Sequence, residues 1–170
     1  MKALVTGGRG FIGSHLTERL LNDGHKVINL DLGERSIRNI NHLWNNDNFV
    51  VVSEDLADRD FREIAEMIVA EKIDWVFHLA GLADVVPSIN DPFTYFKNNV
   101  LATINILEAS RQAKIKKFVY ASSSSVYGIC DSMHIPTSEW APIKPQYPYA
   151  ETKYQGERWV SHYNQVYHLP

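Results

Sequence analysis

Short apolar runs alternate with longer amphipathic stretches along nearly the whole chain. The apolar runs occupy residues 2–6, 26–31, 49–53, 75–78 and 117–121. They have no polar face, which is typical of strands covered on both sides. Residues 11–22, 60–70, 92–113 and 149–167 instead repeat apolar side chains with the period of an α-helix. This order predicts a Rossmann-type, doubly wound α/β fold with a parallel sheet and right-handed crossovers.

Local sequence signals suggest where two of these helices begin or end. Asp58 precedes the second helical stretch and is a plausible N-cap, because a carboxylate can accept a free backbone N–H of the first turn. Gly24 follows the first helical stretch, where glycine commonly ends a helix. The segment after residue 167 begins where an alternating pattern would start another strand, so we expect the chain to be part of a longer protein.

Composition narrows the functional classes. The 170 residues are 45% hydrophobic and carry a net charge of −3, which is typical of one globular domain. The sequence has no basic stripe of the kind that binds nucleic acid, and no apolar run long enough to cross a bilayer. A single cysteine, Cys130, excludes an internal disulfide, and with no basic-then-apolar leader we expect a cytoplasmic protein. We expect a small-molecule ligand and no metal site.

A glycine-rich turn follows the first predicted strand. Gly7, Gly10 and Gly13 have the spacing G-x-x-G-x-x-G. The first glycine permits a tight strand-to-helix turn, the second allows a pyrophosphate to approach the backbone, and the third lets the helix pack closely on the strand. The free N–H groups at the helix start, which include Phe11 and Ile12, would then bind the anion. Glycine strings are a weak signal alone, but this one stands between a strand and a helix.

An acidic residue ends the second predicted strand. Asp31 lies 18 residues after Gly13, where a carboxylate can accept both hydroxyls of an adenosine ribose. A 2′-phosphate would meet like charge there, so NAD is favoured over NADP, although Arg9, Arg35 and Arg38 could accommodate that phosphate. A turn role for Asp31 is the alternative.

Further candidates follow the third and fourth strands. Asp55, followed by Leu56, could accept the adenine amino group or could simply cap a helix. Leu79, Ala80 and Gly81 would allow a flat cofactor to lie against the backbone, whereas the preceding His78 is more typical of a core histidine.

A tyrosine and a lysine stand four residues apart at the start of the last predicted helix. Tyr149 and Lys153 therefore share one helix face. A phenol has an ordinary pKa of about 10. One ammonium about 5 Å away favours its ionised form by roughly 3 kcal/mol at an effective dielectric constant of about 20. A bound nicotinamide cation would add to this effect. The pair suits proton abstraction from an alcohol during hydride transfer, with a serine from residues 122–125 holding the alcohol oxygen.

These motifs and their order resemble the extended short-chain dehydrogenase/reductase family, especially its nucleotide-sugar epimerase and dehydratase branch. The similarity covers the whole chain and includes residues 6–13, 78–81, 91–92, 99–103, 122–128 and 148–153. It implies that Tyr149 is the base and Lys153 its partner and ribose ligand. It further implies that Ser123, four residues before Tyr127, positions the substrate, and that Asn99 contacts the cofactor or braces the site.

The resemblance implies a specific reaction and a larger protein. Residues 1–170 would be the NAD-binding, N-terminal part of an enzyme about twice as long, and the substrate domain would be absent. Dehydratases of the family carry an acidic pair where this chain has Ser124 and Ser125, so dehydration is not expected. Ala83 replaces a residue that is often polar or basic near the nicotinamide, and Ala102 replaces a glycine, with an expected effect on packing only.

The sequence therefore predicts an NAD-dependent epimerase that acts at C4 of a UDP-hexose through a 4-keto sugar. A dehydrogenase or reductase of the same family, and a dinucleotide-binding module without turnover, are the alternatives. By itself, the isolated chain is expected to be feebly active at best. A homodimer through the helices predicted at 92–113 and 149–167 is plausible by analogy with the family.

Overall fold

The computed structural model describes residues 1–33, 37–129 and 135–170. Arg35 and Cys130, which entered the sequence analysis, lie outside these ranges. The strands are β1 (Lys2–Thr6), β2 (Lys26–Asp31), β3 (Phe49–Ser53), β4 (Trp75–His78) and β5 (Lys117–Tyr120). They form one parallel sheet in the order β3-β2-β1-β4-β5. The predicted sheet is confirmed, and the order reverses between β1 and β4, where open α/β sheets bind ligands.

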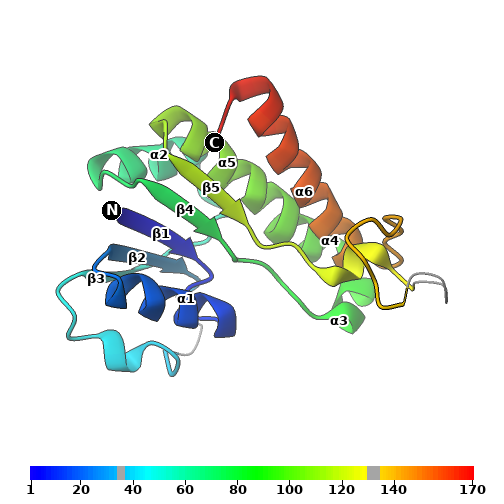
Figure 1. Ribbon diagram of the computed structural model, residues 1–170, viewed down its shortest axis with the longest axis horizontal. Coiled ribbons are helices and arrows are strands. Elements are labelled where there is room, and N and C mark those ends of the chain that lie inside the picture. Colours follow the sequence, from blue (N-terminus) through cyan, green and yellow to red (C-terminus); the bar gives the residue numbers. More distant parts are fainter. Residues whose placement is uncertain (34–36, 130–134) are drawn as a thin grey trace.

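Helices cover both faces of this sheet (Figure 1). On one face, α1 (Phe11–Asn22) and the 3₁₀ helix η1 (Asn41–Leu43) enclose a core that includes Val5, Leu20 and Ile40. On the other face, α2 (Phe61–Ala70), α5 (Ala102–Ala113) and α6 (Pro148–Tyr167) pack over a larger core. The strands are therefore buried from both sides, as their continuous apolar sequences require.

The predicted helix at 92–113 is helical throughout but not uniform. It consists of α4 (Pro92–Tyr95), the π-helical segment η2 (Phe96–Leu101) and α5. The prediction missed a further short helix, α3 (Val85–Asn90). Asp91 separates α3 from α4 and accepts the backbone N–H of Thr94 at 3.1 Å, so it caps the second helix. A wider turn in the middle of the helix leaves no trace in a simple apolar period, so the sequence could not reveal it.

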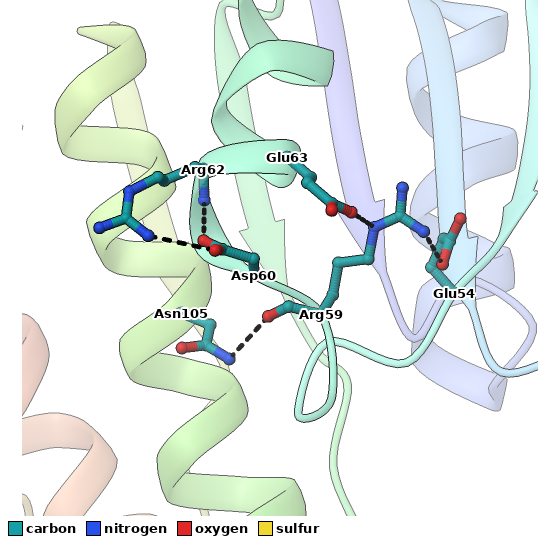
Figure 2. Close-up of polar contacts among 6 residues, drawn as sticks. All are labelled: Glu54, Arg59, Asp60, Arg62, Glu63 and Asn105. Carbon is teal, nitrogen blue, oxygen red and sulfur yellow. Dashed lines mark hydrogen bonds and ion pairs between the residues drawn. The ribbon is translucent and has the colours of Figure 1, made fainter.

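The N-terminus of α2 differs from the prediction (Figure 2). The N-cap is Asp60, not Asp58: its Oδ1 accepts the backbone N–H of Arg62 at 2.8 Å and its Oδ2 the guanidinium of Arg62 at 3.1 Å. Asp58 instead pairs with the Nζ of Lys97 at 2.5 Å. Both carboxylates satisfy the general rule for a cap, and only the path of the chain decides between them.

Arg59 fixes the loop that leads into α2. Its guanidinium lies between Glu54, at 2.7 Å, and Glu63, at 2.6 Å (Figure 2). Its carbonyl oxygen accepts the side-chain amide of Asn105 on α5 at 3.3 Å. Residues 54–60 are thereby tied to both neighbouring helices, which holds Asp55 at the edge of the sheet.

Two classes of feature are absent from the ranges that the structure describes. No helix there combines the length and the apolarity that a membrane crossing requires. The same residues contain no cluster of three or more histidine, cysteine, aspartate or glutamate side chains placed to hold a metal ion.

Candidate functional site

A cavity of about 400 Å³ lies at the carboxyl edge of the sheet, across the point where the strand order reverses. Its walls come from segments that are far apart in the sequence: the β1–α1 turn, the ends of β2, β3 and β4, and the first turns of α6. The site residues predicted from the sequence that line it are Gly7, Gly10, Phe11, Ile12, Gly13, Asp31, Asp55, Leu56, Leu79, Ala80, Gly81, Tyr149 and Lys153. Two predicted residues, Asn99 and Ser123, are not part of this lining.

The three glycines of the first turn serve different purposes. Gly7 has a φ of +70°, and a Cβ there would lie 2.7 Å from the backbone nitrogen of Ala80. At Gly13 a Cβ would lie 2.3 Å from the carbonyl oxygen of Gly7. At Gly10 it would meet only that same oxygen, at 3.2 Å. The fold itself therefore requires Gly7 and Gly13, whereas Gly10 leaves space on the cavity side.

The N-terminus of α1 faces the same cavity. Gly10 is the N-cap, no side chain caps the helix, and its first turn carries no acidic residue. The first N–H groups of a helix have no intrahelical partner and concentrate positive potential. Phe11, Ile12 and Gly13 line the cavity at this helix end. The arrangement suits a phosphate group.

Asp31 ends β2 with its carboxylate held by backbone groups. Oδ2 accepts the N–H of Arg9 at 2.9 Å, and Oδ1 accepts the N–H of Leu32 at 2.8 Å. The guanidinium of Arg9 donates to the carbonyl oxygens of Leu32 and Gly33, both at 3.1 Å, and to Ser53 Oγ at 2.8 Å. Neither Arg9 nor Arg38 lines the cavity, and the charged side chains that the described part of the chain places at this end of it are those of Asp31, Glu54 and Asp55.

His78 is a buried structural residue, as expected. Its side chain is fully buried between two hydroxyls, with Nδ1 2.7 Å from Thr6 Oγ1 and Nε2 3.0 Å from Thr103 Oγ1. Burial, together with the nearby charge of Lys153, lowers the pKa of His78 to about 3. The imidazole is therefore neutral at physiological pH, and it joins β1, β4 and α5 below the cavity.

Tyr149 and Lys153 lie on the first turns of α6. Pro148 occupies the first turn of this helix, where its missing N–H costs nothing. The backbone N–H of Tyr149 donates to Ser88 Oγ on α3 at 3.1 Å, and its ring meets that of Tyr95 edge to face at 6.5 Å. Lys153 is 7% exposed, and burial lowers its pKa to about 8. The structure thus brings a phenol and a buried amine to the wall of the cavity that the glycine turn also lines.

Asn99 braces this wall. Its Oδ1 accepts the N–H of Leu82 at 2.7 Å, and its Nδ2 donates to the carbonyl oxygen of Leu82 and to Thr152 Oγ1 on α6, both at 3.0 Å. The side chain is 2% exposed. Of the two roles left open by the sequence, the geometry matches the brace, because these bonds connect the segment after β4 to α6.

Ser123 has a local structural task. Its hydroxyl accepts the N–H of Ser125 at 3.2 Å and caps the 3₁₀ helix η3 (Ser124–Tyr127). The neighbouring Ser122 lines the cavity instead, and its buried hydroxyl has no hydrogen-bond partner among the described residues. Neighbouring side chains in extended backbone point in opposite directions, so only one of two adjacent serines can face the cavity. A run of four identical residues gives no sequence signal that shows which one it is.

Comparison with known proteins identifies the family of this chain. The family model described as GDP-mannose 4,6 dehydratase matches residues 4–170, nearly the whole chain. The chain belongs to this extended short-chain dehydrogenase/reductase family. Its members include proteins named as epimerases and proteins named as dehydratases of nucleotide sugars.

Two curated relatives illustrate this range. A UDP-glucose 4-epimerase of Mycolicibacterium smegmatis is 40% identical over 99% of this chain and 53% of its own length. A human dTDP-D-glucose 4,6-dehydratase is 34% identical over 99% of this chain and 48% of its own length. The chain thus spans about half the length of the curated relatives it matches.

Solved structures of the family share the fold. The UDP-glucose 4-epimerase of Thermus thermophilus in complex with NAD is 35% identical, with a TM-score of 0.87 over 99% of this chain and 52% of that one. The UDP-N-acetylglucosamine 4-epimerase of Methanobrevibacter ruminantium, in complex with UDP-N-acetylmuramic acid, is 36% identical with the same TM-score over the same shares of the two chains.

The sequence did not indicate several of the residues that line or support the cavity. Ala102, for which only a packing role was expected, lines the cavity, as do Asn98 and Ser122. Ser88, which holds the backbone of Tyr149, was not singled out because an isolated serine in a short helix carries no distinguishing pattern. Tyr120 falls within a predicted strand and carries no further signal in the sequence, although its ring lies under Lys153.

Proposed function

We propose that the whole protein is an NAD-dependent nucleotide-sugar epimerase that inverts C4 of a UDP-hexose. The observation that carries this proposal is the convergence of Tyr149 and Lys153 on the cavity formed by the glycine turn and Asp31. A base for a sugar hydroxyl and a site for a dinucleotide would thus share one cavity. The named 4-epimerases among the relatives support the same reaction class.

The cavity residues fit a dinucleotide. The space beside Gly10 and the N-terminus of α1 would hold the pyrophosphate, Asp31 would accept the adenosine ribose hydroxyls, and Asp55 would face the adenine. Leu79, Ala80 and Gly81 would lie along the rest of the cofactor. When bound, NAD would supply the hydride acceptor and donor that inversion at C4 requires.

The chain's own residues supply the proton chemistry. Tyr149 takes the proton of the 4-hydroxyl through its phenol oxygen and gives it back to the sugar oxygen after the 4-keto sugar has turned over. Lys153 would place its positive charge one helical turn from the phenol and would also bind the cofactor ribose. A hydroxyl just after β5 would position the substrate oxygen. The resemblance to the family assigns this role to Ser123, whereas Ser122 is the serine that lines the cavity.

The residues after β5 favour epimerisation over dehydration. Elimination of water needs an acid and a base beyond the one that serves hydride transfer. The positions that the family's dehydratases use for an acidic pair are Ser124 and Ser125 in this chain. Ser124 begins η3 and is exposed, and neither serine side chain carries a carboxyl group.

The experiment that tests the reaction incubates the full-length protein with UDP- and dTDP-hexoses and follows the products by NMR. We expect the C4 epimer of one UDP-hexose to form without net conversion of NAD to NADH. Accumulation of NADH in step with substrate loss would instead identify a dehydrogenase. If the protein binds NAD but leaves every nucleotide sugar unchanged, it is a binding module.

The choice of NAD can be tested by Asp31→Asn. This substitution keeps an oxygen that can accept the N–H of Arg9 but removes the charge that repels a 2′-phosphate. We expect the ratio of the Kd for NADP to the Kd for NAD, measured by calorimetry, to fall about tenfold, or ~1.4 kcal/mol. Asp55→Asn serves as the control and should change both constants by the same factor. An unchanged ratio in Asp31→Asn would refute the ribose assignment.

A further inference from the structure

The buried ammonium of Lys153 is partnered by an aromatic ring. Its Nζ lies 4.5 Å from the centroid of the Tyr120 ring, within the range of a cation–π interaction. Across residues 1–33, 37–129 and 135–170, no carboxylate lies within ion-pair distance of this ammonium. A ring stabilises the charged amine without neutralising it, whereas a carboxylate would cancel much of its field at Tyr149.

The Tyr120 ring is held firmly in this position. Tyr120 is the last residue of β5, and its hydroxyl donates to the carbonyl oxygen of Lys153 at 3.4 Å. Gly156, one turn further along α6, leaves room for that hydroxyl: a Cβ there would lie 2.1 Å from it. Below, the ring stacks at a tilt on His78 with centroids 5.9 Å apart. Strand and helix thus clamp the ring beneath the amine.

The other charged or titratable groups around Lys153 leave the ring a distinct role. On α6 these are Tyr149, one turn before it, and the half-buried Glu157, one turn after it, whose charge favours the ammonium. From β4, His78 is neutral and contributes no charge. From β5, burial raises the pKa of the Tyr120 hydroxyl, so the ring carries no charge either.

We propose that Tyr120 is a positioning residue that keeps Lys153 charged and directed at the cavity, and thereby extends the activity of the Tyr149 base to higher pH. The inference rests on the proposed function, because it assigns Tyr120 a part in the same proton transfer. Tyr120 touches neither substrate nor cofactor in this role and acts only through Lys153. The role matters because Lys153, with a pKa of about 8, is close to losing its proton under physiological conditions.

The test compares Tyr120→Phe, which keeps the ring, with Tyr120→Met, which fills similar space without one. Removing the ring removes a contact that favours the charged amine, so the pKa of Lys153 falls and the alkaline limb of the pH–rate profile moves down. We expect this limb to move by about one pH unit in Tyr120→Met and little in Tyr120→Phe. Epimerisation by the methionine variant should then be about tenfold below that of the phenylalanine variant at pH 8.5, and within twofold of it at pH 6.

A second measurement does not depend on turnover. NMR titration of the Lys153 side chain, in full-length protein whose lysines carry ¹³C-methyl labels, follows its pKa directly. A lower pKa in Tyr120→Met than in Tyr120→Phe supports the inference even if no nucleotide sugar is epimerised, in which case the proposed function alone fails. Equal Lys153 titrations in the two variants, or equal pH profiles in active enzymes, overturn it. If Tyr120→Met does not fold, Tyr120→Leu takes its place in both measurements.

Discussion

Replacing Tyr149 by phenylalanine should abolish epimerisation while NAD remains bound. The substitution removes one oxygen from the cavity wall and keeps the ring, its edge-to-face contact with Tyr95 and the backbone bond to Ser88. A positioned acid or base contributes about 10²–10⁴ to the rate, so we expect turnover to fall about 1000-fold or more. The Kd for NAD should change by less than about threefold, because the substitution removes one hydroxyl and leaves the residues proposed to hold the pyrophosphate and the riboses in place. Product formation by NMR and NAD binding by calorimetry measure the two effects.

Tyr154→Phe provides the matched control for this experiment. Tyr154 lies on the same helix, five residues further along, and does not line the cavity. Its variant should keep the wild-type rate, which separates loss of the base from a general effect of removing a phenol from α6. Undiminished epimerisation by Tyr149→Phe would show that another group takes the proton, and the catalytic assignment would fail.

The second large effect concerns Gly10 and Gly13, two glycines of one turn. An added methyl group should destabilise the fold at Gly13 and weaken cofactor binding at Gly10. In Gly13→Ala the new Cβ would press on the Gly7 carbonyl, so α1 must move away from β1. Overpacking of backbone against backbone should cost about 3 kcal/mol of unfolding free energy and lower the Tm by roughly 10 °C. Gly10→Ala meets only one neighbouring oxygen at 3.2 Å and should stay within about 2 °C of the wild type.

The substitution Gly10→Ala, which should leave the stability nearly unchanged, should weaken the binding of NAD. Its new methyl group would occupy the space beside the helix N-terminus where we place the pyrophosphate, so the Kd for NAD should rise at least about tenfold. Thermal unfolding and calorimetry on the full-length protein measure both variants. A Gly13→Ala protein as stable as the wild type would contradict the packing argument. A Gly10→Ala protein that binds NAD normally would move the pyrophosphate elsewhere.

The fold could be predicted because it depends on repeated, local patterns. Strands buried on both faces must be apolar at every position, and these runs marked all five strands to within one residue. Contacts between distant segments left weaker traces. Either Asp58 or Asp60 could have capped α2, and the interactions of Asp58 with Lys97 and of Asp60 with Arg62 decided the matter.

The site was predictable where backbone geometry imposes a residue type. Gly7 and Gly13 are required by close approach of backbone atoms, and the spacing of Tyr149 and Lys153 follows from the helix repeat. The partners of these residues were not predictable. Tyr120 reaches Lys153 only because β5 ends beneath α6, and Ser88 reaches Tyr149 only because an unforeseen helix precedes the one at 92–113. Such pairings depend on tertiary packing, which a period in one segment does not record.

The π-helical turn at Phe96–Leu101 places a constraint on the length of the chain. A π-turn contains an extra residue compared with an α-turn, and Asn99 lies within it, facing Leu82 and Thr152. Deleting any one residue of this turn would let the helix relax to the ordinary repeat, so that the wide turn that carries Asn99 would be lost. The amide would then face another direction, and the cavity wall would lose its tie to α6. Natural variants of this segment should therefore conserve both its number of residues and the amide at position 99.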